Sequence, residues 1–256
     1  MKELLYKASC GVSPLPLYLA VNITNRCNRK CSFCPYHSPT LAYNAHYRWF
    51  KSQPADIDVS KLHLFLHNIK HKIKHIAITG KGEPMLHPHF ILICDVIDMY
   101  NISFSVTTNG DKLTQEMMWQ LEELDNLTML RVSVYDAATA DYWLTVQTTT
   151  HIPITLFNQT GQHVDGMEDG FTVYCEGNEG QTRPKDFNTK TSCRAPFSFI
   201  TMNTDGSLVP CYSYNEVGDG FTQKFSRIWN GSKIRRFRKD ALKMQCINSD
   251  CKNCSL

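Results

Sequence analysis

Between residues 17 and 160, short apolar segments alternate with longer segments of helical periodicity, and this alternation constrains the fold more than any other feature. The apolar segments predict strands at residues 17–23, 75–79, 102–107, 129–134, 152–157 and 171–174. The segments between them predict helices at residues 60–74, 90–100, 114–124 and 137–146. Because strands and helices that take turns build parallel sheets, we expect an α/β fold. Five or six such units match a partial (β/α)6 TIM-like barrel rather than a closed barrel.

The composition changes after residue 175, where polar and glycine residues become frequent. We therefore expect one domain at residues 1–180 and a small cysteine-rich domain at residues 181–256. In the second domain, Asp205-Gly206 is a hairpin signal between arms at residues 198–202 and 207–211, and a helix to residue 244 should follow. Such a short segment cannot build a large core, so a metal cluster would stabilise it.

Composition and charge exclude two classes of partner. The 27 basic and 24 acidic side chains leave a net charge of +3, which is too balanced for a nucleic-acid-binding protein. The longest apolar run, at residues 90–100, is interrupted by Asp95 and Asp98, so no membrane span is expected.

The 11 cysteines gather towards the ends of the chain, and no signal-peptide pattern is present. This pattern favours cluster binding in a reducing compartment, and we expect a cytoplasmic protein.

Three cysteines follow the first predicted strand. Cys27, Cys31 and Cys34 have the spacing C-x3-C-x2-C and stand at the carboxyl end of that strand, where sites of parallel α/β folds form. A structural zinc ion or an ordinary 4Fe–4S cluster binds four thiolates. Three thiolates would leave one iron open to a substrate or cofactor, which favours an enzyme. The other interpretations are unrelated thiols and a zinc site that His37 completes.

Further motifs stand at the ends of the next three strands. They are Gly-Lys-Gly-Glu-Pro at residues 80–84, Thr-Thr-Asn-Gly at residues 107–110, and Ser133. Together with the cysteine triad, and in this order, they resemble the radical S-adenosylmethionine (SAM) superfamily over residues 17 to about 160. Lys81 departs from the double glycine that this family usually carries, while Gly82, Glu83 and Pro84 keep the core of the motif.

The resemblance implies a role for each motif. The three thiolates hold a 4Fe–4S cluster, and the amine and carboxylate of SAM bind its open iron. Gly82 and Glu83 contact the methionyl amine. Ser133 and Asn109 contact polar groups of the cofactor, and Phe33 lies against the adenine. One electron, from a low-potential donor such as flavodoxin or ferredoxin, cleaves SAM and produces a 5′-deoxyadenosyl radical. This radical takes a hydrogen atom from the substrate. Iron–sulfur potentials reach about −700 mV, which permits the reductive cleavage of SAM.

A second cysteine set lies in the C-terminal region, in the pattern C-x12-G-x4-C followed by C-x2-C. It consists of Cys193, Cys211, Cys251 and Cys254. Four thiolates can also bind zinc. The pattern, however, resembles the twitch extension, a shortened SPASM domain, which implies one fully ligated auxiliary 4Fe–4S cluster. Cys246 is a fifth thiol beside this set, and it is either a spare cysteine, an alternative ligand or a hydrogen-atom donor.

Two reactions are open after hydrogen abstraction. Loss of an electron to the auxiliary cluster and of a proton to a base gives net oxidation, as in the aminocyclitol dehydrogenases that the chain resembles in length and auxiliary cysteine spacing. Glu176 and Arg183 are the candidate proton acceptors. Return of a hydrogen atom from Cys246 or Cys175 would instead give epimerisation. A non-catalytic iron–sulfur or zinc module is the alternative from another class.

The substrate class is weakly constrained by the sequence. Many SPASM relatives modify ribosomal peptides and carry an N-terminal peptide-recognition domain. Only 16 residues precede the first predicted strand, so we expect that domain to be missing. This favours a small molecule such as a sugar or aminocyclitol over a peptide.

Two basic segments carry no motif. The histidines at positions 63, 67, 71 and 75 recur every four residues among lysines, and five basic residues lie between residues 233 and 239. We expect both segments to form solvated helix faces, since no carboxylate joins the histidines and the lysines repel cations. The second segment alternatively docks an acidic peptide or a phosphate.

Overall fold

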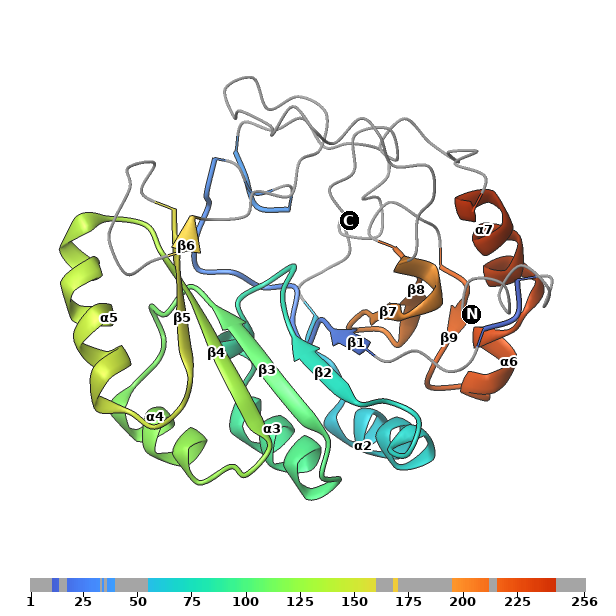
Figure 1. Ribbon diagram of the computed structural model, residues 1–256, viewed down its shortest axis with the longest axis horizontal. Helices are drawn as coiled ribbons and strands as arrows, with labels where there is room; N and C mark the ends of the chain where they lie inside the picture. Colours follow the sequence, from blue (N-terminus) through green and yellow to red (C-terminus); the bar gives the residue numbers. More distant parts are fainter. Residues whose placement is uncertain are drawn as a thin grey trace.

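The computed structural model describes residues 11–13, 18–32, 34, 36–39, 55–159, 168–169, 195–211 and 216–242 (Figure 1). These residues form one sheet of nine strands in the order β6-β5-β4-β3-β2-β1-β7-β8-β9. The strands are β1 (Tyr18–Val21), β2 (His75–Ile78), β3 (Ser103–Thr108), β4 (Leu127–Val134), β5 (Ile154–Asn158), β6 (Glu168–Asp169), β7 (Phe199–Met202), β8 (Ser207–Val209) and β9 (Gly218–Asp219). The helices are α2 (Val59–Ile69), α3 (Phe90–Met99), α4 (Gln115–Glu122), α5 (Ala137–Thr149), α6 (Phe225–Trp229) and α7 (Ser232–Leu242), with short 3-10 turns at Pro84–Leu86 and Ala195–Phe197.

Strands β1 to β6 pair in parallel in the order in which they follow one another, as βα units do. The sheet does not close into a barrel, so the predicted α/β fold with a partial barrel is confirmed. Strand β7 extends the sheet on the other side of β1 and is also parallel to it. The boundary expected near residue 180 and the strand expected at residues 171–174 lie outside the described residues, and the boundary stays a prediction.

The predicted C-terminal hairpin is present. Strands β7 and β8 pair antiparallel, and β9 pairs antiparallel with β8. The turn between β7 and β8 contains Gly206, whose φ of +85° lies in the left-handed region that favours glycine. The Asp205 carboxylate accepts a hydrogen bond of 2.9 Å from the Ser207 backbone N–H. The sheet therefore runs from the barrel strands into the hairpin without interruption.

Acceptor side chains fix the starts of the barrel helices. Asp58 accepts a hydrogen bond from the backbone N–H of Lys61 at the start of α2, and Thr114 and Asp136 begin α4 and α5 in the same way. Helix α2 ends at Ile69 rather than at the predicted residue 74, since a tight turn follows it. Only two of the four regularly spaced histidines therefore lie on α2, and the expected single basic face is wrong.

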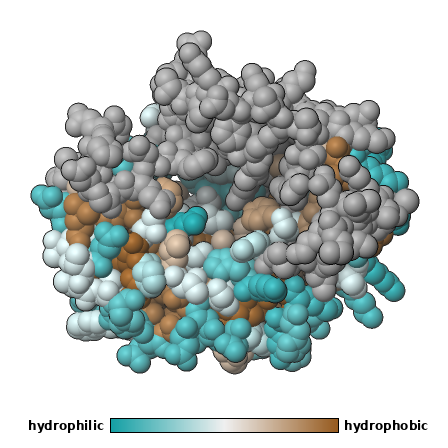
Figure 2. Space-filling view, in the orientation of Figure 1, coloured by the Kyte–Doolittle hydropathy of each residue, from teal (hydrophilic) through white to brown (hydrophobic). Residues whose placement is uncertain are grey.

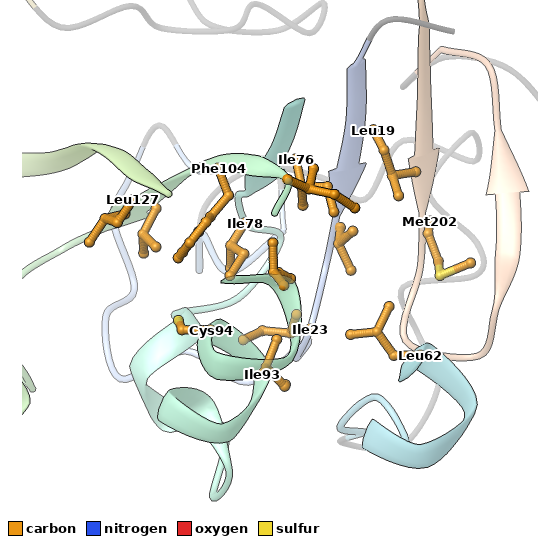
Figure 3. Packing of buried hydrophobic residues seen from close by; sticks show 14 of the residues in the cluster. Leu19, Ile23, Leu62, Ile76, Ile78, Ile93, Cys94, Phe104, Leu127 and Met202 are labelled. Carbon is orange, nitrogen blue, oxygen red and sulfur yellow. The ribbon is translucent and has the colours of Figure 1, made fainter. Parts of the chain in front are cut away.

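Helices α2 to α5 cover one face of the sheet, and the apolar core lies between them and the strands (Figures 1 and 3). Leu19, Ile76 and Phe104 are neighbours on three adjacent strands and are fully buried. They pack with Leu62 of α2 and Ile93 of α3 (Figure 3). Burying each such side chain contributes roughly 1.5–3 kcal/mol. Figure 2 shows hydrophilic side chains over much of the outer surface below the sheet.

The opposite face of the sheet, called the inner face below, carries the residues that alternate with the core residues along β1–β5 and β7. It consists of Tyr18, Ala20, Asn22, His75, Ala77, Ser103, Ser105, Thr107, Met129, Arg131, Ser133, Thr155, Phe157, Phe199 and Thr201. This face is mostly polar, in contrast to the apolar face under the helices.

Helix α7 corrects one expectation about the basic segment at residues 233–239. Arg238 is fully buried rather than solvated. It donates hydrogen bonds to the carbonyls of Pro196 (2.8 Å) and Gly11 (3.0 Å), and its guanidinium lies 4.1 Å from the centroid of the Trp229 ring. Carbonyl acceptors and an aromatic ring make the burial of this cation tolerable.

No helix among the described residues is long and apolar enough to cross a membrane.

Candidate functional site

The cysteine triad lies in the loop that follows β1. Backbone N–H groups point at two of its sulfurs: Arg29 N lies 3.4 Å from Cys27 Sγ, and His37 N lies 3.3 Å from Cys34 Sγ. Burial is the largest cause that raises the pKa values of Cys27 and Cys34. Iron binding would offset this by deprotonating the thiols, and the N–H donors would then stabilise thiolate ligands. The thiols and their N–H donors therefore have the chemistry of iron–sulfur ligands, while no three potential ligands among the described residues converge around a single metal ion.

A network of polar side chains ties this loop to the ends of β3 and β4. The Arg29 guanidinium forms a two-pronged salt bridge with Asp111, with 2.7 Å between Nε and Oδ2. The Asn28 amide also donates to Asp111 (2.7 Å) and accepts from the Asn109 amide (2.9 Å). The guanidinium of Arg29 lies 4.2 Å from the centroid of the Tyr135 ring. Sequence reasoning found Asn109 but missed Arg29, Asp111 and Tyr135, although Asp111 directly follows the Asn109-Gly110 motif.

Gly82 brings the loop after β2 into backbone contact with the cysteine loop. The Glu83 N–H donates a hydrogen bond of 2.7 Å to the Arg26 carbonyl. A Cβ at Gly82 would lie 2.6 Å from the Thr24 carbonyl oxygen and would also collide with the Arg26 carbonyl oxygen. Only glycine permits this approach, so the motif has a packing reason that is independent of any cofactor.

The Glu83 carboxylate links β2 to β3. One oxygen accepts from the Thr108 hydroxyl (2.6 Å) and the Met85 N–H (3.3 Å), and the other accepts from the Asn109 N–H (2.7 Å). The side chain is 2% exposed, and burial raises its pKa although these hydrogen bonds lower it. Each carboxylate oxygen has two lone pairs, so the oxygen bound to Asn109 keeps capacity for one more donor, such as an amine.

Ser133 is half-buried on the inner face near the carboxyl end of β4. Tyr135, two residues later, shares hydrogen bonds with Ser133 and with the Cys31 thiol, and burial is the main cause that raises the pKa of Tyr135. The structure thus brings Ser133, Asn109 and Glu83 to the same end of the sheet as the cysteine loop. Phe33 lies outside the described residues, and all the cofactor contacts expected from the sequence stay predictions.

Lys81, the departure from the expected double glycine, is a buried amine that joins the barrel to the hairpin. It is 3% exposed, and its Nζ donates a hydrogen bond of 2.9 Å to Asn203 Oδ1 beyond β7. The same Oδ1 accepts from the Asn22 amide (3.0 Å). The Lys81 carbonyl lies 2.8 Å from His37 Nε2, next to the cysteine loop. Burial lowers the pKa of Lys81 to about 6, and Asp205 counteracts this in part.

This low pKa predicts a pH dependence of stability. Between about pH 6 and pH 10.5 the unfolded chain holds a proton that folded Lys81 does not, so folding releases it and stability rises with pH. Replacing Lys81 with Met removes this contribution, which reaches about 1.4 kcal/mol per pH unit at most. We expect urea midpoints of the wild type to rise more steeply with pH than those of Lys81→Met between about pH 6.5 and about pH 8.5, a range inside this window.

The matched control for this prediction is Lys72→Met, because Lys72 is an exposed lysine. Its stability curve should run parallel to that of the wild type. Parallel curves for Lys81→Met and the wild type would contradict the assignment of a neutral buried amine.

The C-terminal ligand set is described only at Cys211, which follows β8 and is partly exposed. The other expected ligands, Cys193, Cys251 and Cys254, lie outside the described residues, as do Cys246, Cys175, Glu176 and Arg183. Their roles as cluster ligands, hydrogen donor or proton acceptors therefore stay predictions.

Comparison with known families identifies two domains. Residues 21–138 match the radical SAM superfamily, and residues 193–255 match SPASM, described as an iron–sulfur cluster-binding domain. The chain therefore contains a radical SAM domain followed by a SPASM-type iron–sulfur domain. Two cofactor sites follow from these domains: a 4Fe–4S cluster that binds SAM, and an auxiliary iron–sulfur cluster.

Curated relatives match shorter parts of the chain. The tungsten-containing aldehyde ferredoxin oxidoreductase cofactor-modifying protein of Pyrococcus furiosus is 29% identical over 42% of this chain and 28% of its own length. A GTP 3′,8-cyclase of Campylobacter jejuni is 34% identical over 36% of this chain and 27% of its own length. The chain thus spans little more than a quarter of these relatives.

Solved structures match nearly the whole chain. BtrN in complex with AdoMet and 2-DOIA has a TM-score of 0.70 at 19% identity, covering 96% of this chain and 95% of BtrN. SuiB of Streptococcus suis bound to the precursor peptide SuiA has a TM-score of 0.59 at 12% identity, covering 99% of this chain and 72% of SuiB. At these identities the likeness establishes the shared fold.

Proposed function

We propose that this radical SAM protein oxidises a small molecule, such as a sugar or an aminocyclitol, with the auxiliary cluster as electron acceptor. The observation that carries the proposal is the direct pairing of β1 with β7. The cysteine triad follows β1, and the hairpin that leads to Cys211 begins with β7. One continuous sheet therefore supports both expected cluster sites.

The strand directions determine at which ends of the paired strands these two sites begin. Because β8 runs antiparallel to β7, Cys211 stands at the opposite end of the strands from the triad. Strands of four residues are about 13 Å long, and this length separates the strand ends from which the two cysteine segments leave the sheet. An oxidation that delivers one electron to the cluster at Cys211 fits this arrangement.

When bound, the SAM cluster and SAM supply hydrogen-atom abstraction from a carbon of the substrate. For an alcohol, the remaining change to a ketone releases one proton and one electron. The auxiliary cluster would accept the electron, and a base, for which Glu176 and Arg183 remain our candidates, would accept the proton. The near-complete coverage of BtrN, solved with 2-DOIA bound, supports a small molecule over the peptide alternative represented by SuiB.

The proposal includes a reducing, cytoplasmic location and a low-potential electron donor such as flavodoxin or ferredoxin. The clustered cysteines support the location, because oxidising compartments would convert them to disulfides. The donor is required because SAM cleavage consumes one electron in each cycle.

The experiment uses reconstituted, oxygen-free protein with SAM, dithionite and a panel of aminocyclitols and sugars in heavy water. We expect 5′-deoxyadenosine in amounts that match a ketone product, with Cys246→Ala as active as the wild type. Deuterium at an inverted carbon, lost in Cys246→Ala, would instead establish epimerisation. Absence of 5′-deoxyadenosine would refute radical chemistry altogether.

A further inference from the structure

Within strands β1–β5 and β7, the inner face of the sheet offers hydrogen-bonding groups without acidic residues, and the acidic residue that continues its register is Glu168 of β6, beside Phe157. Its central strands contribute the hydroxyls of Ser103, Ser105, Thr107, Ser133 and Thr155. No Asp or Glu occupies a position on this face in strands β1–β5 or β7. A ligand on this part of the face therefore meets neutral donors and acceptors, together with the basic groups described next.

Arg131 is the permanent cation of the inner face within these strands. Its neighbours in register are Thr107 on β3 and Thr155 on β5. The guanidinium lies 5.7 Å from the centroid of the Phe157 ring, and Nε lies 3.2 Å from Met129 Sδ. The side chain is exposed, and neither salt bridge between described residues includes it. The Phe157 ring and the Met129 thioether thus position this guanidinium, and no carboxylate of the described residues forms a salt bridge with it.

His75 adds a second basic group at the amino end of the same face. Its ring nitrogens lie 2.9 Å from Ser103 Oγ and 3.0 Å from Ser105 Oγ, and the Tyr18 ring packs against it edge-on at 5.7 Å. Burial lowers the pKa of His75, and the charge of Arg131 lowers it further. Both side chains belong to the inner face, and because the pKa of His75 is lowered, the positive charge that favours anions there comes from the Arg131 guanidinium.

We propose that Arg131 binds an anionic group, a carboxylate or a phosphate, of a small-molecule substrate held on the inner face. The proposal rests on the proposed function, since it names the substrate class of the same site. A guanidinium binds such groups through two parallel hydrogen bonds. Ser133 lies on the same face of β4, two residues further, or about 6.6 Å along the strand. A substrate anchored at Arg131 therefore extends towards the residue expected to contact SAM.

The test measures binding to the full, reconstituted protein under anaerobic conditions and without reductant, so that turnover plays no part. The probes are glucose 6-phosphate, glucuronate and glucose, which share a sugar ring and differ in charge. Equilibrium dialysis should show that both anionic probes bind at least about tenfold more tightly than glucose, the discrimination typical of one charge-assisted contact. Arg131→Gln should remove this preference, and Arg131→Lys should keep part of it.

The matched control is Arg227→Gln, because Arg227 is an exposed arginine of α6, away from the inner face. It should bind all probes as the wild type does, and circular dichroism checks the folding of each variant. Stronger binding of glucose 6-phosphate or of glucuronate identifies phosphate or carboxylate as the preferred group, and either result supports the proposal.

Three results would overturn the proposal. The first is equal binding of charged and uncharged probes by the wild type, and the second is unchanged binding of all ligands in Arg131→Gln. The third is a loss of SAM affinity in Arg131→Gln with unchanged probe binding, since the guanidinium would then serve the methionyl carboxylate. Failure of the proposed function is distinguishable, because it appears as absent 5′-deoxyadenosine after reductant is added and leaves the dialysis result unaffected.

Discussion

Gly82→Ala is expected to abolish the formation of 5′-deoxyadenosine and to lower the iron content at the cysteine triad. The added Cβ would meet backbone oxygens of Thr24 and Arg26, and these atoms belong to the segment that leads into Cys27. Backbone cannot yield as a flexible side chain does, so the loop itself must move. Overpacking of this kind costs about 1–3 kcal/mol of stability. A displacement of 1 Å at a reacting centre can cost about 100-fold in rate.

The matched control for Gly82→Ala is Gly220→Ala. A Cβ at Gly220 would meet only the ends of side chains, Met202 Cε at 2.7 Å and Phe65 Cε2 at 2.9 Å. Both are side-chain atoms of the core rather than backbone atoms beside the triad, so the change should affect core packing and not the cysteine loop. Iron analysis, electron paramagnetic resonance and 5′-deoxyadenosine assays should therefore separate the two variants. Wild-type iron content and activity in Gly82→Ala would show that the close approach is dispensable.

Glu83→Gln is expected to reduce 5′-deoxyadenosine formation by at least about 100-fold, as loss of a positioned electrostatic contact does. The carboxylate accepts hydrogen bonds from Thr108, Met85 and Asn109. An amide has one acceptor atom, so its NH2 group must face at least one of these donors. Loss of a buried, charge-assisted hydrogen bond costs about 1.5–3 kcal/mol. The same change would remove the negative charge expected to bind the methionyl amine.

Glu122→Gln is the control for this prediction, because Glu122 accepts a hydrogen bond from the Thr150 hydroxyl (2.6 Å) at the end of α4, away from the cysteine loop. Its activity should equal that of the wild type, and its denaturant midpoint should change little. Calorimetric SAM binding distinguishes two origins of the Glu83 effect. A stable Glu83→Gln protein that binds SAM normally would assign Glu83 to the structural link between β2 and β3 alone.

Local patterns predicted the barrel elements well because their causes are local. Apolar runs bounded by turn residues predicted β1 to β5, and helical periodicity predicted the helices between them. The end of α2 was misjudged because the lysine-rich stretch after Ile69 keeps a helical spacing of histidines while the chain already turns towards β2. Arg238 was misjudged because its partners, Gly11 and Pro196, are far away in the sequence.

The same distinction applies to the candidate site, where short motifs predicted some residues and contacts between distant segments could not be predicted. The triad, Glu83 and Asn109 were found because each stands at the end of a strand, where a motif of a few residues carries the signal. The links of Arg29 to Asp111 and of Lys81 to Asn203 join residues far apart in the sequence, and no local spacing encodes them.

By itself, the amino-acid sequence determined the order of strands and helices, the radical SAM motifs and the two cysteine groups, since hydrophobic periodicity and short motifs depend on near neighbours. The tertiary structure alone decided that β7 lies beside β1, that Lys81 is buried at their carboxyl ends, and that Arg131 stands on a polar inner face. These features depend on which strands become neighbours, and packing of the whole sheet decides that.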